Sequence, residues 1–298
     1  MKTDSILLLG LLVCLCFPGC AFLRDQFSRR DAAPPAQPWT RHATPTLEQI
    51  IQAVNQNSQS IRNFTSDNAS ISLPNVIIPL HSRISFERPL RLRMHGSAMS
   101  FGSREFDFGS NDEIFWLWIR ANDGIMWYCR HDQFAFSPVR DAIPIEPAWL
   151  IEALGIVEFK PTDMHLGPHR LPDGNWEIVS HTHTPSGQFR RRTVIDHKVG
   201  WIVRQELYTP QDELVAMAHV INSRYDPVAR VYFARRVEVQ FQGMPGKMTI
   251  DLGTPTFNRL EPFASDTFRM PAFEGSRAVD IASPELQARG ASIQTVVR

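Results

Sequence analysis

The sequence predicts a mainly β protein with a few helices (α+β), in which one curved antiparallel sheet of about ten to twelve strands wraps on an N-terminal amphipathic helix. Two patterns predict this class. A stretch of helical period opens the domain, and from Phe64 onward the apolar residues alternate with period two between turn sequences. Lys+Arg and Asp+Glu both number 31 among the 298 residues, so no net charge attracts a polyanion. A nucleic-acid partner is therefore not expected.

The N-terminus carries a targeting segment. Met1 and Lys2 precede an apolar run, Ile6–Phe17, which is too short to span a bilayer and is typical of a secretory signal peptide, here assigned to residues 1–19. Phe17-Pro-Gly-Cys20 resembles the bacterial lipobox, because a small residue precedes the cysteine. This resemblance implies that Cys20 is lipidated, with acyl chains such as palmitate. The alternative is a plain signal peptide, or an uncleaved anchor, in which Cys20 has no role.

Residues 20–45 are predicted to be a lipidated N-terminus and tether, because Ala32–Pro38 is rich in Pro and Ala and has no apolar period. A single folded domain is expected over 46–272, followed by a polar C-terminal extension, 273–298, that we expect to fray. Only Cys129 lies in the exported domain, so no internal disulfide is available.

The first element of the domain is predicted to be a helix over Thr46–Arg62. Leu47, Ile50, Ile51, Val54 and Ile61 recur at helical spacing and form one apolar stripe. Thr46 and Gln49 have the spacing of a capping box, so the helix should begin there.

Short strands follow the helix. Leu90, Leu92 and Met94 alternate with polar residues, as do Phe106 and Phe108. Ile114–Ile119 is an uninterrupted apolar run, so both faces of that strand should be covered. A second helix is expected over Glu146–Leu154, ended by Gly155. Further strands are expected at Trp176–Val179, Phe189–Ile195, Trp201–Tyr208, Leu214–Ile221, Val228–Phe241, Met248–Leu252 and Phe257–Leu260.

This layout resembles the lipoprotein-carrier family of LolA, LolB and the related LppX/LprG lipoproteins over residues 45–272. The resemblance rests on the opening segment Thr46–Leu73, on the tryptophan-rich Asn111–Tyr128 after an acidic turn, and on the closing Phe268–Pro271. It implies an open half-barrel that is closed by helices and encloses an apolar cavity. It also implies a lipid or acyl chain as ligand, a lipid-anchored position in the bacterial cell envelope, on the outer membrane or another periplasmic face, and other envelope lipoproteins as partners.

Four aromatic residues are candidates for the wall of such a cavity: Phe115, Trp116, Trp118 and Trp127. The alternative is that they fill the core, as aromatics do in any fold. Strand alternation places Trp116 and Trp118 on one face and Phe115 on the other, so only one of these sets can line the cavity.

Metal binding, catalysis and the binding of a lipid phosphate have weaker support in the sequence. His181 with His183, and His165 with His169, could be metal ligands, but no HExxH or paired CxxC sequence accompanies them, so no metal or cofactor is expected. The sequence contains no Gly-x-Ser-x-Gly and no phosphate loop, so we do not expect an enzyme. Arg190–Arg192 could bind a lipid phosphate or, more simply, pair with nearby acids.

Two functions remain open from the sequence. The main hypothesis is a membrane-anchored lipoprotein that binds or transfers a lipid or lipoprotein acyl chain without catalysis. The alternative is an envelope scaffold or interaction module with a filled core. The two differ in whether apolar volume is left open inside the sheet.

Overall fold

The computed structural model describes residues 44–74, 76–98, 102–121, 124–137, 146–184, 187–243 and 245–283. All of them belong to one compact unit, 34–298. The predicted signal peptide (1–19), the lipidation site Cys20 and nearly all of the tether lie outside the described residues. Within the described part of the chain, no helix has the length and apolar content needed to cross a membrane.

The helices are α2 (Leu47–Ser60), α3 (Pro147–Ala153) and the single 3₁₀ turn η1 (Phe134–Phe136). The predicted capping box of α2 is confirmed: the Thr46 hydroxyl accepts from Gln49 N–H, and the Gln49 side chain accepts from Thr46 N–H. The helix ends at Ser60 and not at Arg62 as predicted. Ile61 already has extended backbone (φ −91°, ψ 94°) and packs into the core beside the strands, so its place in the helical stripe was wrong.

Fifteen strands lie in the described residues, more than the ten to twelve predicted. They are β1 (Asn63–Ser72), β2 (Leu80–Glu87), β3 (Arg91–Ser97), β4 (Arg104–Ser110), β5 (Ile114–Ile119), β6 (Ile125–Arg130), β7 (Met164–Arg170), β8 (Trp176–Thr184), β9 (Gly187–Ile195), β10 (Ile202–Tyr208), β11 (Leu214–Asp226), β12 (Val231–Phe241), β13 (Met248–Asp251), β14 (Thr256–Phe257) and β15 (Arg277–Asp280).

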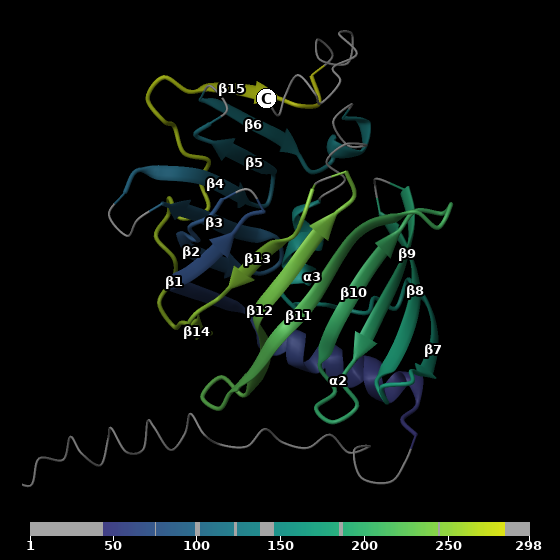
Figure 1. The fold of residues 1–298 in the computed structure, drawn as a ribbon. Coiled ribbons are helices and arrows are strands. Elements are labelled where there is room, and N and C mark those ends of the chain that lie inside the picture. Colours follow the sequence, from purple (N-terminus) through teal and green to yellow (C-terminus); the bar gives the residue numbers. More distant parts are fainter. Residues whose placement is uncertain are drawn as a thin grey trace, which may run out of the picture. The chain divides into compact units, whose positions relative to one another are not determined.

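The strands form one open curved sheet in the order β15-β6-β5-β4-β3-β2-β1-β13-β12-β11-β10-β9-β8-β7, and β14 pairs with β1 (Figure 1). Every pairing is antiparallel except that of β15 with β6, which is parallel. Strand β1 lies between β2 and β13 and so joins the run β2–β6 to the run β7–β12. The predicted C-terminal extension, 273–298, therefore contributes an edge strand to the sheet.

Helices α2 and α3 define the inner face of the sheet, and the opposite face is its outer face. Ile50 and Val54 of α2 pack against Trp176, Ile178 and Ile195 at the β7–β10 end. Helix α3 lies in the main core between the two runs of strands (Figure 1). The main core includes Phe64, Phe86 and Leu92 from β1–β3, Trp149, Leu150 and Leu154 from α3 and the end of that helix, and Val237, Val239 and Phe241 from β12.

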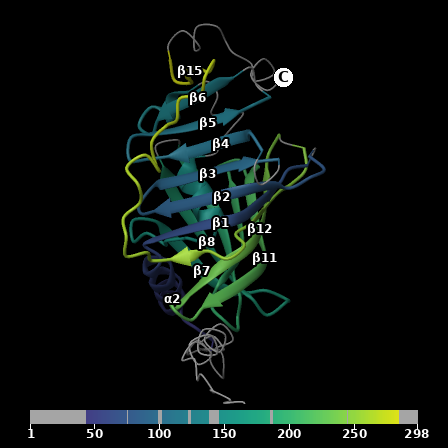
Figure 2. The same cartoon turned by 90° about the vertical axis from the view of Figure 1, so that its left-hand side faces the viewer.

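After β14 the chain returns along the outer side of β1–β6 to β15, and we call residues 258–276 the outer strap (Figure 2). Its start is fixed where Arg62 N–H donates to the Asn258 side chain (2.9 Å) and Asn258 N–H donates to the Asn63 carbonyl (2.9 Å). Further on, the Asn111 amide donates to the Phe268 carbonyl (3.2 Å). The outer strap is thus bound to the strands at several points along its length.

Candidate functional site

The four predicted aromatic residues lie on two different faces. Trp116 pairs with Gly109 of β4 and Tyr128 of β6, and Trp118 pairs with Asp107 and Met126, so both indoles lie on the outer face. Phe115 and Trp127 lie on the inner face. The four residues therefore do not line one cavity, as period-two alternation requires, and a ligand contact for Phe115 and Trp127 stays a prediction.

Trp116 and Trp118 are covered by the outer strap. Trp116 is fully buried, and with Trp118 and Met126 it forms a cluster against Met270 and Phe273. The rings of Trp118 and Phe273 are 4.3 Å apart between centroids. These contacts confirm that the outer face of β5 is covered, whereas on its inner face Leu117 and Ile119 are only partly buried.

Glycine at position 109 permits the Trp116 ring to lie across β4. A Cβ atom on Gly109 would lie 2.0 Å from the Trp116 ring, closer than any side chain could tolerate. Any other residue at 109 would therefore displace the indole from its position under the strap.

A buried carboxylate, Asp107, lies beside Trp116 on the outer face. It is 0% exposed and accepts from Trp116 Nε1 (2.9 Å), Arg104 (2.7 Å) and Arg93 (3.0 Å). Arg93 also donates to two strap carbonyls, of Asp266 (3.2 Å) and Thr267 (3.1 Å). These bonds give the charge the partners that a buried carboxylate needs and connect the strap to β3 and β4. In the sequence, Asp107 is only a polar residue between two phenylalanines, and nothing there indicates that the outer face is covered.

The inner end of β5 and β6 forms a small core. Phe115 packs with Cys129, Phe134 of η1 and Ile281, and the rings of Phe115 and Phe134 meet edge to face at 5.2 Å. Burial, reinforced by the charges of Asp280 and Asp132, raises the pKa of Cys129 to about 12. The thiol is therefore protonated at neutral pH and poorly nucleophilic.

Next to this core lies the inner apolar wall, which we define as the half-buried inner-face residues of β4–β6: Phe106, Phe108, Leu117, Ile119 and Trp127. Their register makes them neighbours, since Phe108 is opposite Leu117 and Leu117 is opposite Trp127. By contrast, Ile84 and Leu92 on the adjoining part of the inner face are 0% exposed. Phe106 and Phe108 also pack against the main core, and the wall as a whole is only partly buried.

Helix α3 fills the inner face between the two runs of strands. Trp149 meets Phe241 edge to face at 5.4 Å. The Glu152 carboxylate accepts from Arg191 (2.6 Å), which is 4% exposed, and the Glu152 carbonyl accepts from the Gln205 amide (2.7 Å). Helix α3 is thus held by both apolar and charged contacts.

The run Arg190–Arg192 pairs with acids on both faces. Arg191 points inward to Glu152, whereas Arg190 binds Asp212 (2.7 Å) on the outer face. Arg192, also on the outer face, binds Glu177 and Glu206. The simpler interpretation of this run, pairing with nearby acids, is confirmed.

Two of the four histidines that the sequence offered as metal ligands make other contacts. His165 hydrogen-bonds with the Ser180 hydroxyl (2.8 Å) and the Lys160 carbonyl (2.9 Å), and His183 with the Gln188 amide (3.0 Å). In the described ranges, no three His, Cys, Asp or Glu residues gather in a metal-binding group.

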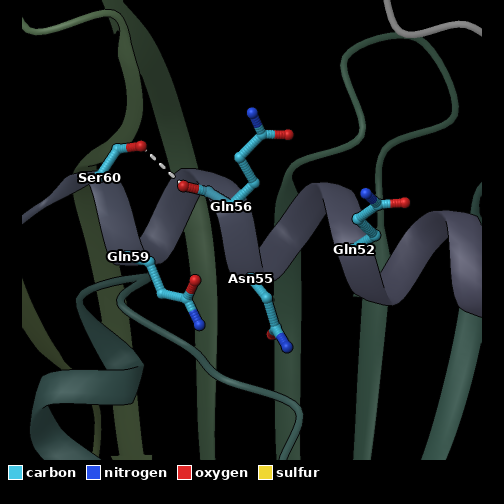
Figure 3. A pocket seen from close by; sticks show the side chains of 5 residues that line it. All are labelled: Gln52, Asn55, Gln56, Gln59 and Ser60. Atoms are coloured by element: carbon cyan, nitrogen blue, oxygen red, sulfur yellow. Dashed lines mark hydrogen bonds between the residues drawn. The ribbon is translucent and has the colours of Figure 1, made fainter.

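A shallow polar pocket of about 590 Å³ lies along α2, lined by Gln52, Asn55, Gln56, Gln59 and Ser60 (Figure 3). The Asn55 amide is already engaged, because it donates to the Phe159 carbonyl (2.9 Å) and accepts from Phe159 N–H (2.8 Å). The lining has no ionisable group and no apolar side chain. Its residues suit neither catalysis nor the binding of an acyl chain.

Three consecutive aliphatic residues are exposed in the loop between β1 and β2. Val76 is 40% exposed, Ile77 99% and Ile78 64%. We call Val76–Ile78 the aliphatic loop. Such exposure of adjacent large apolar side chains is unfavourable in water and indicates a surface for contact with a membrane or a partner.

Comparison with known proteins gives structural neighbours only. No protein-family model matches the sequence, and no curated protein is similar to it. One of the structural neighbours is a protein of the LolA superfamily. The family that the sequence resembles is thus represented among the solved structures that match.

Three neighbours have TM-scores between 0.46 and 0.48. One is a DUF1329 family protein from Desulfovibrio piger ATCC 29098, with 11% identity and a TM-score of 0.47 over 76% of this chain and 98% of that chain. The LolA superfamily protein, from Nitrosomonas europaea, has 10% identity and a TM-score of 0.46 over 73% and 96%. A domain described as an outer membrane lipoprotein-sorting protein, from Vibrio parahaemolyticus, has 12% identity and a TM-score of 0.48 over 75% and 97%.

Proposed function

We propose that this protein is a lipid-anchored protein of the bacterial cell envelope that binds an acyl chain of a lipid or lipoprotein and catalyses no reaction. The inner apolar wall is the observation that carries the proposal. Three neighbouring strands present large apolar side chains there, and these side chains are only half-buried.

An acyl chain matches this surface physically. Each methylene group removed from water contributes about 0.8 kcal/mol, so a chain lying along Phe108, Leu117 and Trp127 would be stabilised without any polar partner. The wall adjoins the filled core around α3, which would limit how far a chain could enter. The ligand is therefore expected to lie along β4–β6 and not to cross the whole sheet.

The aliphatic loop supports a position at a membrane. Val76–Ile78 lies at the hairpin between β1 and β2, and its side chains are suited to the boundary between head groups and acyl chains. Together with acyl groups on Cys20, this loop would give the domain a second point of contact with the bilayer. Two such contacts hold a protein at a membrane more firmly than one.

The binding site can be tested with a bromine-labelled fatty acid, because bromine quenches tryptophan only at short range. Dibromostearate added to the detergent-solubilised protein should quench part of the tryptophan emission, and Trp127→Phe should remove most of that quenching. Trp118→Phe is the matched control, since Trp118 lies on the outer face under the strap, and it should retain the quenching. Equal quenching in both variants would place the ligand elsewhere.

The anchor is tested separately. Cys20→Ala should give unprocessed or soluble protein, and recovery of this variant in the membrane fraction with unchanged mobility would contradict lipidation at Cys20.

One observation favours a second function, an envelope scaffold. Five of the seven residues of α3 are buried, so the centre of the inner face is a packed core. Under the scaffold hypothesis no lipid co-purifies with the detergent-extracted protein in native mass spectrometry, and dibromostearate quenches nothing. Under the acyl-binding proposal both signals are present.

A further inference from the structure

A second groove, of about 800 Å³, lies on the outer face, remote from the inner apolar wall. It runs between the outer strap and strands β1–β4. Thr65 and Ser85 lie side by side in its lining, with their hydroxyl oxygens 3.4 Å apart. The lining also contains four arginines: Arg83, Arg93, Arg104 and Arg259.

The charges of the lining are unbalanced. Against the four guanidinium groups stand two lining carboxylates, Asp67 and Asp266. Asp107, beneath the groove, is already bonded to two of the arginines and to Trp116. Once these acids are counted, positive charge remains in excess.

Two of the arginines are available to a ligand. Arg83 pairs with Asp67 at 2.6 Å, but both side chains are more than half exposed, so the pair contributes little and a better partner can replace it. Arg259 has no ion pair with any described residue; its guanidinium lies over the Phe263 ring, 5.2 Å from the centroid. This stacking holds Arg259 at the groove while leaving its N–H groups to bind an anion.

The pKa of His95 reflects the positive charge around the groove. Burial and the charges of Arg104, Arg93 and Arg83 together lower the pKa of His95 to about 4, and the charge of Asp107 acts in the opposite direction. The imidazole is therefore neutral at neutral pH. A bound anion would favour its protonation and raise its pKa.

We propose that this groove binds a phosphate group, with Arg83 and Arg259 as charged donors and the hydroxyls of Thr65 and Ser85 as neutral ones. Guanidinium groups match phosphate oxygens in geometry and charge, and hydroxyls complete the set of donors. The group can come from a phospholipid head or from a free phosphate compound. Because the groove lies on the opposite face from the acyl-binding wall, this proposal is independent of the proposed function.

The test is titration calorimetry on the full-length protein in a non-ionic detergent at low salt, with two probes: inorganic phosphate and the short-chain lipid dihexanoylphosphatidylglycerol. The double variant Arg83→Gln/Arg259→Gln removes two donors that take no part in the Asp107 network. It should weaken binding by about tenfold or more. Arg224→Gln on β11 is the matched control, because Arg224 is exposed and far from the groove in the sheet order, and it should bind as the parent does.

The two probes distinguish the sources of the phosphate. Binding of both indicates recognition of phosphate itself, and binding of the lipid alone indicates recognition of a phospholipid head group; both outcomes support the site if the double variant weakens them. A rise in the pKa of His95 on saturation, measured by NMR, places the anion in this groove. The absence of saturable binding by either probe, or binding that the double variant leaves unchanged, would overturn the proposal.

Discussion

Strands β8–β12 and strands β4–β6 bury opposite faces of the same sheet. In β8–β12 the helices cover the inner face, and the outer face carries exposed ion pairs such as Arg190 with Asp212. In β4–β6 the outer strap covers the outer face, and the inner apolar wall is half-buried. Each run of strands is therefore stabilised from a different side. The comparison shows that the inner face of β4–β6, although part of it packs against η1 and the main core, is less completely covered than the inner face of β8–β12.

The largest effect should come from the helix-covered region. Trp149→Ala should lower the free energy of unfolding by about 3–5 kcal/mol, because Trp149 is 7% exposed and packs against Phe241. Urea unfolding followed by circular dichroism measures this loss. A loss below about 1 kcal/mol would mean that α3 is not part of the core.

Asp107→Asn should cost about 3 kcal/mol, since it leaves Arg93 and Arg104 without their carboxylate partner. The damage should be local to the strap-covered region: limited proteolysis should cut within 258–276 before it cuts elsewhere. Asp212→Asn removes an exposed carboxylate that pairs with Arg190 and should change stability by less than about 0.5 kcal/mol. Equal effects of the two variants would contradict a structural role for the buried network.

Leu117→Ala in the inner apolar wall should cost about 1 kcal/mol, much less than Trp149→Ala, because Leu117 is only partly buried and is a smaller side chain. The variant should at the same time weaken fatty-acid binding, since it removes part of the wall. A cost as large as that of Trp149→Ala would show that the wall is ordinary core, and would remove the contrast between the two regions.

The pH dependence should also be specific to the strap-covered region. His95 has a folded-state pKa of about 4 against an ordinary value of 6.5, so the unfolded chain binds a proton that the native protein does not. Stability should therefore fall as the pH drops from about 6.5 to about 4. His95→Gln should flatten the profile in this window, and an unchanged profile would exclude His95 as its source.

The smallest effect concerns Cys129, which is 0% exposed and is a free thiol. Reductant should leave the melting temperature of the protein unchanged, and a thiol reagent should react only after denaturant is added. A clear fall in melting temperature with reductant would mean that Cys129 takes part in an intermolecular disulfide.

Local sequence patterns predicted the elements whose structure is determined by residues close to them in the chain. The capping box of Thr46 and Gln49 is confirmed, and so is a strand over Ile114–Ile119, in which Phe115, Trp116 and Trp118 are buried and the other residues are partly buried. Strand β7 was missed because Gly167 and Pro168 interrupt it and its residues do not alternate clearly. The edge strand Arg277–Asp280 was missed because it lies in a polar tail whose partner, β6, is some 150 residues earlier.

The candidate sites depend on contacts that no local pattern contains. Alternation along β5 separates Trp116 from Phe115, but it does not say which of them a distant segment covers. That choice is made by Met270 and Phe273 in the outer strap. The groove between the outer strap and β1–β4 likewise combines Arg83 with Arg259, which are far apart in sequence and close in space because β14 returns to β1.

The pairing of β1 with β13 also determines how late in synthesis the sheet can be completed. The Ser66 hydroxyl donates to the Leu252 carbonyl across 186 residues of chain, so the two runs of strands join only after nearly the whole domain has been synthesised. Closing so long a loop is entropically costly, and sheets that depend on such distant contacts fold slowly. Until β13 arrives, one edge of β1 is unpaired and can associate with other chains. A chain truncated before residue 248 should therefore aggregate rather than form a smaller stable sheet.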